Sequence, residues 1–385
     1  MNTKRFRTKT EFIPKDNLKV DGIWEVGIDI GYSAVKFISP NMVGSFPSYA
    51  RRVSDDFQYV SEPPESSILY RNDDTGELWL VGEMAQNTMA TGDTSDSEAS
   101  LYGRGRYSSA MFDVISKAGL GMCRMSNEIR NFDENDKMII QTGLPERYMD
   151  DEDELKEALA KDYNFSLKVG KGDWVEHRFS VDIDDIEVMS QPRGTLFSVC
   201  IDKFGNFRSE AESYLSSSVL VFDPGFGTLD IFPIKNGFVE NGGETFPDLG
   251  MKRVLSETAR KIRSKYGVNV EVPAMQKYLE TGFVKYFNKK TFESGEKPFG
   301  KFLDEASREV CEEALSRMSS VFNLIDYNYL IVTGGTGAAW LDQIREKFKA
   351  SDTLTILNGN QNDNLPFIYN NVRGYYLYRY MKLKR

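Results

Sequence analysis

Two short stretches, about half a chain apart, each place an aspartate shortly before a glycine-containing turn. In the first stretch Asp29 precedes Gly31, and in the second Asp223 precedes Gly225 and Gly227. Each turn lies between two apolar runs, which is typical of a β-hairpin. A glycine-rich tip lets backbone N–H groups approach a phosphate closely, and a carboxylate beside it can hold a divalent cation through water. The two stretches are therefore candidates for a phosphate and metal site, with two ordinary hairpins as the alternative.

A third glycine-rich segment, Thr333–Gly337, follows the apolar run Tyr329–Val332 and precedes a predicted helix. Backbone N–H groups at a helix start favour anionic or polar ligand groups, and the absence of side chains lets a flat base or a ribose lie close. The segment is not the dinucleotide-binding fingerprint, because no acidic residue follows a second strand at the expected distance.

The two aspartate-bearing stretches agree beyond the aspartate itself. Tyr32 corresponds to Phe226, and Val35 corresponds to Leu229. One supersecondary unit thus occurs twice, which predicts a duplicated α/β fold.

A chain of 385 residues is long for a single core, so we expect two lobes. The predicted division places lobe I at residues 23–200, with residues 358–385 packing back on it, and lobe II at residues 201–357. Residues 1–22 are polar and mixed in charge, and we expect them to form a flexible N-terminal extension.

Composition excludes several classes of protein. The net charge of −10 argues against broad, nonspecific DNA binding. No apolar stretch approaches the ~18–20 residues of a membrane span, and no signal peptide is recognisable. Cys123, Cys200 and Cys311 lie far apart and are expected to be buried, reduced thiols of a cytoplasmic protein. The single histidine, His177, lies among charged residues and is expected to be solvated, which argues against a histidine general base.

The three glycine motifs, in this order, resemble those of the actin-like ATPase superfamily, which also includes sugar kinases and DnaK-type chaperones. The resemblance makes Asp29–Lys36 the first phosphate loop, Asp223–Asp230 the second, and Thr333–Gly337 the adenosine loop. It implies a duplicated ribonuclease-H-like actin fold with two lobes around a nucleotide cleft.

Within this superfamily the chain looks most like plasmid-segregation actins of the ParM type. Four shorter motifs carry this likeness: Val81–Ala85, Thr142–Pro145, Val188–Gln191 and Asn371–Tyr376. The likeness implies a nucleoside triphosphatase, using ATP or GTP with Mg²⁺, that polymerises into filaments. Its implied partners are further copies of itself and an adaptor protein bound to a centromere-like plasmid DNA site, with no direct DNA contact and no membrane contact, in the cytoplasm.

The resemblance also implies roles for particular residues. Asp29 and Asp223 would hold Mg²⁺, largely through water. Asp223 and Gln191 would be catalytic. Lys36 would neutralise phosphate charge and Lys252 would reach the ribose or base, although both are also compatible with solvated surfaces. The implied nucleotide-binding set is Asp29, Gly31, Tyr32, Ser33, Lys36, Gly225, Phe226, Gly227, Thr228, Lys252, Gly334, Gly335, Thr336 and Gly337.

Gln191 stands where some relatives carry a glutamate and where actins carry a glutamine. A glutamine cannot act as an ordinary general base, but it can orient the attacking water by hydrogen bonds. The alternative is that Gln191 only ends a strand before Pro192.

Two other functions fit the same fold. A small-molecule kinase of the sugar type needs an aspartate that deprotonates the substrate hydroxyl, and no further Asp-x-Gly site follows the two phosphate loops. A cell-shape or cell-division actin-like filament protein is the other alternative.

Overall fold

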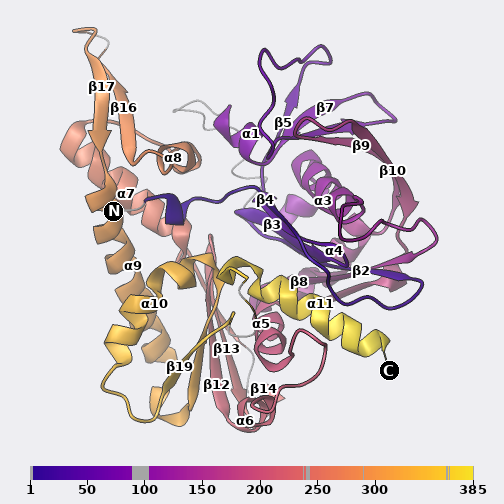
Figure 1. The fold of residues 1–385 in the computed structure, drawn as a ribbon. Coiled ribbons are helices and arrows are strands. Elements are labelled where there is room, and N and C mark those ends of the chain that lie inside the picture. The colour runs from indigo at the N-terminus through magenta and orange to yellow at the C-terminus, as the bar shows by residue number, and fades with distance from the viewer. Residues whose placement is uncertain are drawn as a thin grey trace.

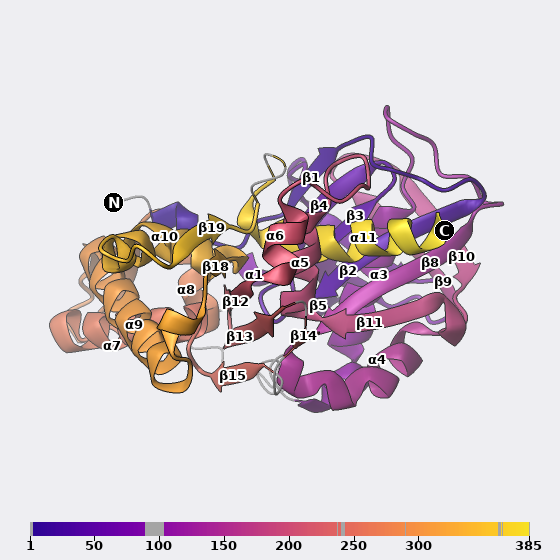
Figure 2. The same ribbon diagram turned by 90° about the horizontal axis from the view of Figure 1, so that it is seen from below.

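Each lobe is built on a large mixed β-sheet (Figures 1 and 2). The computed structural model of the chain describes residues 3–88, 104–236, 238–239, 243–288, 290–360, 363 and 365–384. Residues 87–106 are rich in Ser, Thr, Gly and charged residues, which predicts a surface loop, and they lie largely outside this described part.

The main sheet of lobe I has its strands in the order β1–β4–β3–β2–β8–β11. Their bounds are β1 (Glu11–Pro14), β2 (Ile23–Ile30), β3 (Ala34–Ser39), β4 (Met42–Pro47), β8 (Lys137–Leu144) and β11 (Ile186–Ser190). β2 is buried almost throughout because helices cover both faces of the sheet. Ile28 contacts the helix α3 (Ala110–Cys123), and its neighbour Gly27 contacts the C-terminal helix α11 (Asn370–Leu383) on the opposite face.

A second, antiparallel sheet of lobe I covers the other side of α3. Its strands are β5 (Ala50–Val53), β6 (Ile68–Asn72), β7 (Leu78–Val81), β9 (Asp162–Val169) and β10 (Trp174–Ser180), in the order β10–β9–β6–β7–β5. The short helices α1 (Glu83–Asn87) and α4 (Glu152–Leu159) complete the lobe.

The expectation that His177 is solvated was wrong. His177 is only 3% exposed and stacks on Phe165 of β9, with ring centroids 5.1 Å apart. Side chains alternate along β10, so His177 points inward although its neighbours Glu176 and Arg178 are exposed. Burial lowers the pKa of His177 to about 4, so the side chain is neutral near pH 7.

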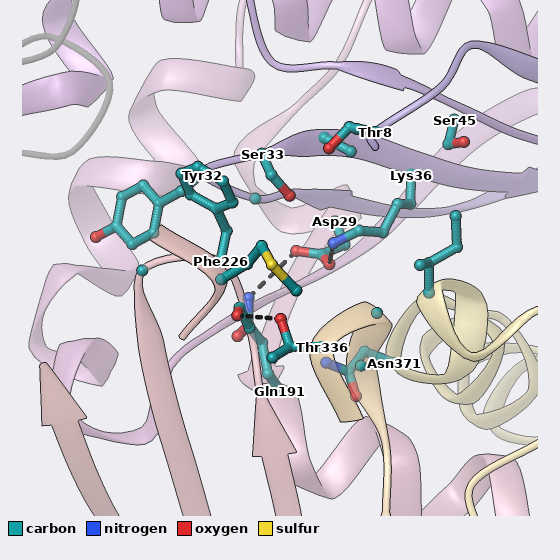
Figure 3. Close-up of a pocket in the computed structure, with 18 of the residues that line it drawn as sticks. Thr8, Asp29, Tyr32, Ser33, Lys36, Ser45, Gln191, Phe226, Thr336 and Asn371 are labelled. Carbon is teal, nitrogen blue, oxygen red and sulfur yellow. Dashed lines mark hydrogen bonds and ion pairs between the residues drawn. The ribbon is translucent and has the colours of Figure 1, made fainter. Parts of the chain in front are cut away.

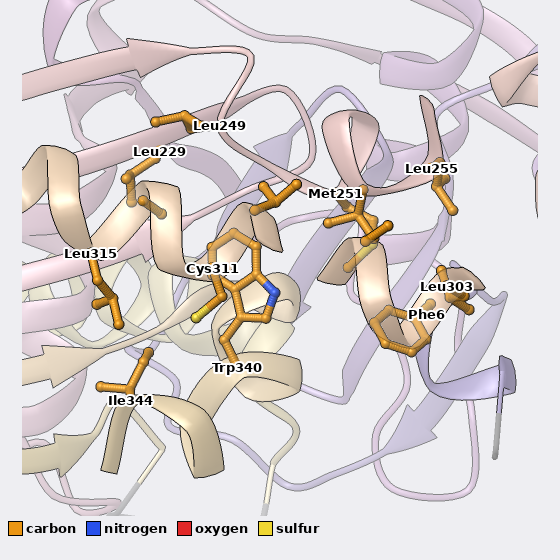
Figure 4. Close-up of a cluster of buried hydrophobic side chains, with 14 of the residues drawn as sticks. Phe6, Leu229, Leu249, Met251, Leu255, Leu303, Cys311, Leu315, Trp340 and Ile344 are labelled. Carbon is orange, nitrogen blue, oxygen red and sulfur yellow. The ribbon is translucent and has the colours of Figure 1, made fainter. Parts of the chain in front are cut away.

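The sheet of lobe II runs in the order β14–β13–β12–β18–β19, with β15 beside β13. Its strands are β12 (Ser218–Pro224), β13 (Thr228–Lys235), β14 (Phe238–Val239), β15 (Glu244–Pro247), β18 (Tyr329–Val332) and β19 (Thr355–Asn358). The larger core lies on one face, under α7 (Met251–Tyr266), α9 (Gly300–Val321) and α10 (Gly334–Phe348) (Figure 4). The other face packs on α5 (Gln191–Cys200) and α6 (Ala211–Ser216).

The expected duplication of the fold is confirmed by strand pairing. β2 forms an antiparallel hairpin with β3 and pairs in parallel with β8. β12 forms an antiparallel hairpin with β13 and pairs in parallel with β18. Each lobe thus has the same hairpin and parallel strand at the centre of its sheet, and the two aspartates occupy corresponding positions.

Lobe II also carries α8 (Val272–Tyr278) and a hairpin of β16 (Phe283–Phe287) and β17 (Ser294–Pro298), which projects from its upper end in Figure 1. The three cysteines are free and buried, as expected. Within the described residues no helix has the length and apolarity that crossing a bilayer requires.

Residues 3–14 differ from the flexible extension that the sequence predicted. Thr3–Phe6 form a 3₁₀ turn against lobe II, and β1 adds to the edge of the lobe I sheet by pairing with β4. The segment crosses from one lobe to the other (Figure 1). Apolar Phe6 and Phe12, embedded in an otherwise polar stretch, supply the packing that orders it.

Helices α5 and α11 cross each other between the lobes. α11 contacts β2, β3 and β8 of lobe I, and α5 contributes Leu196, Val199 and Cys200 to a cluster with the lobe II strands. A division after residue 200 stays a prediction.

Candidate functional site

A cavity of about 420 Å³ is lined by residues of both lobes. The two predicted phosphate loops, the first turn of α10 and residues 5–11 all line it. Of the residues expected to act on or bind nucleotide, all line the cavity except Lys252 and Gly337. Figure 3 shows how several of these side chains converge on the cavity.

The first hairpin places Asp29 at the end of β2, where its carboxylate is buried. Lys36 Nζ lies 2.7 Å from Asp29 Oδ2, so Lys36 is the ion-pair partner of the aspartate and not a solvated strand residue. Gln191 Nε2 donates a hydrogen bond of 3.2 Å to Asp29 Oδ1 (Figure 3). Gln191 is the first residue of α5, and this position brings its amide into the cavity.

The second hairpin places Asp223 on the opposite side of the cavity. Its Oδ2 accepts a hydrogen bond of 2.7 Å from Asn371 Nδ2, at the start of α11. Burial raises the pKa of Asp223 to about 6, and the nearby charge of Asp29 adds a smaller increase. A bound cation would stabilise the ionised form of this buried carboxylate.

A third carboxylate, Asp230, lies opposite Asp223 across the β12–β13 ladder and also lines the cavity. Thr228 Oγ1 and Thr245 Oγ1 donate hydrogen bonds to its two oxygens, at 2.9 Å and 2.5 Å. Burial raises the pKa of Asp230 to about 7 despite these bonds.

The two hairpin tips approach each other closely. A Cβ atom added to Gly227 would lie 3.1 Å from the Tyr32 ring, so the tip of the second loop leaves little space beside the first. Tyr32 and Phe226 are the corresponding residues of the two tips, and Figure 3 shows both on the same side of the cavity.

The third glycine loop requires its first glycine. Gly334 has φ +73°, and a Cβ atom there would lie 2.5 Å from Asp223 Oδ1 and 2.9 Å from the Pro224 carbonyl oxygen. Thr336 Oγ1 donates a hydrogen bond of 2.7 Å to the Gly225 carbonyl, which joins the third loop to the second. The first turn of α10 therefore lines the cavity, where its N-terminal dipole favours an anionic group.

Lys252 and Gly337 do not line the cavity. The Lys252 backbone N–H donates to the Phe226 carbonyl at 2.8 Å, which fixes the start of α7 against the second loop. Gly337 is buried, and a Cβ atom there would contact Val332 and Pro224.

The donor set fits a hard divalent cation. Asp29 and Asp223 both present carboxylates to the cavity, and oxygen ligands are those that Mg²⁺ prefers. In the part of the chain that the structure describes, no group of three or more His, Cys, Asp or Glu side chains is placed to hold a metal. Two carboxylates suit a cation whose remaining ligands are water and phosphate oxygens.

Several residues that line the cavity were not assigned to it from the sequence, and three of them bear directly on its charged groups. Arg106 is 8% exposed, donates to the Ile30 carbonyl, and places its guanidinium carbon 4.8 Å from the centre of the Tyr32 ring. Asn371 holds Asp223, and Asp230 adds a carboxylate. Asp230 lies within the second predicted loop and Asn371 within the motif Asn371–Tyr376, whereas no predicted motif included Arg106.

Residues 27–194 match the family model for the N-terminal domain of actin like proteins. No curated protein sequence shows a significant match to the chain. Among solved structures, a non-polymerisable quadruple mutant of pCBH ParM has a TM-score of 0.69 at 18% identity, covering 92% of this chain and 98% of that one. A 15-stranded ParM filament from Clostridium botulinum has a TM-score of 0.67 at 17% identity, with coverage of 92% and 98%. Ta0583, an archaeal actin homolog in complex with ADP, has a TM-score of 0.61 at 17% identity, with coverage of 92% and 98%.

The chain therefore has the actin-like fold, and the resemblance predicted from its three glycine motifs is confirmed. More particularly, residues 27–194 are similar to the N-terminal domain of actin like proteins, and ParM proteins are among the structures that share the whole fold.

Proposed function

We propose that the chain is an actin-like nucleoside triphosphatase that binds ATP or GTP with Mg²⁺ and assembles into nucleotide-dependent filaments. The observation that carries this proposal is the convergence of two aspartate-bearing hairpins and a glycine-rich helix start on one cavity. Two structures with the same fold, a ParM filament and an archaeal actin homolog in complex with ADP, support this proposal.

In the proposed reaction, the backbone N–H groups of both hairpin tips hold the β- and γ-phosphates. Asp29 and Asp223 would hold Mg²⁺ mainly through water, and the ion would supply positive charge for the phosphate oxygens. Lys36 holds Asp29 in place and adds charge near the phosphates. Gln191, held by its bond to Asp29, orients the attacking water through its amide oxygen.

The filaments are proposed to segregate plasmid DNA through an adaptor protein bound to a centromere-like DNA site, in the cytoplasm and without direct DNA or membrane contact. This part rests on the likeness to ParM. The net charge of this chain, −10, supports contact with DNA through an adaptor and not directly.

Sedimentation and light scattering of the purified protein with Mg²⁺ and ATP, GTP or no nucleotide test assembly. We expect polymer only with a nucleoside triphosphate, and its absence under every condition would overturn the filament proposal. Phosphate release by Asp223→Ala tests the cavity separately, because unaltered hydrolysis would remove Asp223 from the mechanism.

Gln191→Ala tests the water-positioning role. We expect nucleotide binding to persist and hydrolysis to fall by about tenfold to a hundredfold, because the water loses its orientation. Filaments of this variant should form and persist. The control is Gln343→Ala, whose side chain bonds to the Arg308 carbonyl away from the cavity. Disassembly of Gln191→Ala filaments at the wild-type rate would contradict the role.

A small-molecule kinase of the sugar type is the second candidate, and Asp230 favours it. This third carboxylate lines the cavity with a pKa raised to about 7, as a base for a substrate hydroxyl would require. Phosphate release to water without any added acceptor supports the filament ATPase, whereas release that depends on an added sugar supports the kinase.

A further inference from the structure

Residues 3–14, here called the N-terminal strap, are attached to both lobes. On lobe II, Thr3 Oγ1 donates a hydrogen bond of 2.6 Å to the Leu279 carbonyl, and the Phe6 ring is 4% exposed within the lobe II core. Figure 4 shows Phe6 near Leu303 and Met251. On lobe I, β1 pairs with β4 from Glu11 to Pro14. The strap thus connects the two lobes by noncovalent contacts at both of its ends.

Arg7 joins the lobes at the middle of the strap. Its guanidinium forms one ion pair of 2.6 Å with Glu280, just after α8 in lobe II, and another with Glu83, the first residue of α1 in lobe I. The Arg7 side chain is 11% exposed, so both pairs are shielded from solvent on the arginine side. A partly buried pair of this kind is worth more than an exposed one.

Two hydrogen bonds from backbone N–H groups of the strap to side chains of the lobes fix the strap beside Arg7. The Thr8 N–H donates to Gln276 Oε1 on α8, and the Thr10 N–H donates to Glu83 Oε2 on α1, both at 3.3 Å. The strap therefore runs between α8 and α1, the two short helices that face each other across the lobes.

The strap is also one wall of the cavity. Every residue from Arg5 to Glu11 lines it, together with Asp29 and Asp223. Figure 3 shows Thr8 on the same side of the cavity as Ser33 and Lys36. Arg5, Arg7 and Lys9 all line this wall, and because Glu83 and Glu280 offset the charge of Arg7, the charge that favours an anionic ligand comes from Arg5 and Lys9.

We propose that the N-terminal strap closes the nucleotide cavity and that Arg7 is the positioning residue that holds it closed across the two lobes. The rate of nucleotide release is then set by the opening of the strap. Opening requires the Arg7 ion pairs to break, and full detachment also removes Phe6 from the lobe II core. This inference rests on the proposed nucleotide-binding function.

The test is the dissociation rate of a fluorescent ATP analogue, measured by stopped-flow chase with excess ATP on the full-length protein. We expect Arg7→Ala to release the analogue about ten to a hundred times faster, the factor for losing hydrogen bonds to charged partners. Arg7→Lys should lie between wild type and Arg7→Ala, since a lysine keeps the charge but cannot bond both carboxylates in the same fork. The control is Arg260→Ala, which removes an exposed ion pair with Glu257 on α7.

Two further variants keep the test valid if Arg7→Ala does not fold. Glu83→Gln and Glu280→Gln each weaken one of the two ion pairs and should each accelerate release. Thermal unfolding of the same variants separates a positioning role from a purely structural one, because a merely structural arginine would lower the melting temperature without changing the dissociation rate.

Unchanged dissociation rates in all these variants, with normal nucleotide binding by wild type, would overturn the strap inference alone. No binding of ATP or GTP by wild type would overturn the proposed function and this inference with it.

Discussion

At the scale of single residues, three buried aspartates share one cavity and each is held by a different partner. Lys36 pairs with Asp29, Asn371 donates to Asp223, and two threonine hydroxyls donate to Asp230. Only Asp29 has a cationic partner among these contacts. Burial raises the pKa values of Asp223 and Asp230, and the charges of neighbouring carboxylates raise them further by a smaller amount, so the site suits a cation.

Gly334→Ala should abolish nucleotide binding. The new Cβ atom would lie 2.5 Å from Asp223 Oδ1, so the aspartate must move, and the backbone keeps a φ of +73° that alanine disfavours. Gly22→Ala is the matched control, since Gly22 also has φ +73° but nothing lies within 4 Å of the added atom. Both variants should lose about 1–2 kcal/mol of unfolding free energy for the left-handed backbone. Nucleotide titration should show that only Gly334→Ala loses binding, and equal binding by the two would contradict the clash.

Glu25→Gln should change how stability depends on pH. Glu25 is fully buried on β2, and burial raises its pKa from 4.5 to about 8, which Tyr376, Lys19 and Arg379 only partly offset. The folded state therefore holds a proton that the unfolded state loses, so wild-type stability falls as pH rises from about 4.5 to about 8. The glutamine variant lacks this fall in stability, because the glutamine side chain does not titrate. Urea unfolding across this range should show that the free energy of unfolding of the variant rises relative to that of wild type as pH increases. A constant difference between the two proteins would contradict the raised pKa of Glu25.

At the scale of elements, the crossing of α5 and α11 couples the lobes to the site. Asn371 at the start of α11 bonds to Asp223, and Arg373 on the same helix donates to the Ser198 carbonyl on α5. The helices approach so closely that a Cβ atom on Gly374 would lie 1.7 Å from the Gly194 carbonyl oxygen. Two glycines thus set the distance at which α11 reaches the cavity.

Gly374→Ala should separate the two helices. We expect a loss of about 1–3 kcal/mol of unfolding free energy from overpacking. Because Asn371 moves with α11, nucleotide affinity should fall as well. Gly105→Ala is the control, since nothing lies within 4 Å of a Cβ atom there. Denaturant unfolding and nucleotide titration measure the two effects, and wild-type values for both would show that the helices adjust without cost.

At the scale of the whole molecule, the lobes are joined around the cavity by the α5–α11 crossing and by the N-terminal strap. A ligand that contacts both hairpins adds a third connection. Binding to the folded state alone raises stability in proportion to the logarithm of ligand concentration.

Thermal unfolding with Mg²⁺ and either ATP or GTP should therefore show a higher melting temperature. At a nucleotide concentration 100 times the dissociation constant, the free energy of unfolding increases by about 2.7 kcal/mol. The nucleotide with the larger shift at equal concentration is the one that the cavity prefers. Asp223→Ala should lose most of the shift, and no shift with either nucleotide would contradict binding between the lobes.

The sequence alone predicted the two hairpins, the glycine loop at Thr333–Gly337 and the duplicated actin-like fold. These features have local signals: apolar strands that end in an aspartate, and glycines where a turn must be tight. The same signals located the three glycine loops that line the cavity, and the resemblance to actin-like proteins added Gln191 and Lys36, which line it too.

Only the tertiary structure decided which distant residues complete the site. Asn371 bonds to Asp223 across 148 positions, and Arg7 bonds to Glu280 across 273. From the residues around them, Asn371 is predicted only to lie at a helix start and Arg7 only to lie in a polar N-terminal extension. The local sequence around a side chain does not show which distant residue it will contact. His177 was misjudged for the same reason: its neighbours are charged, but the alternation of β10 and the facing Phe165 bury it. Local pattern determined the loops of the cavity, and packing between distant segments decided what holds them together.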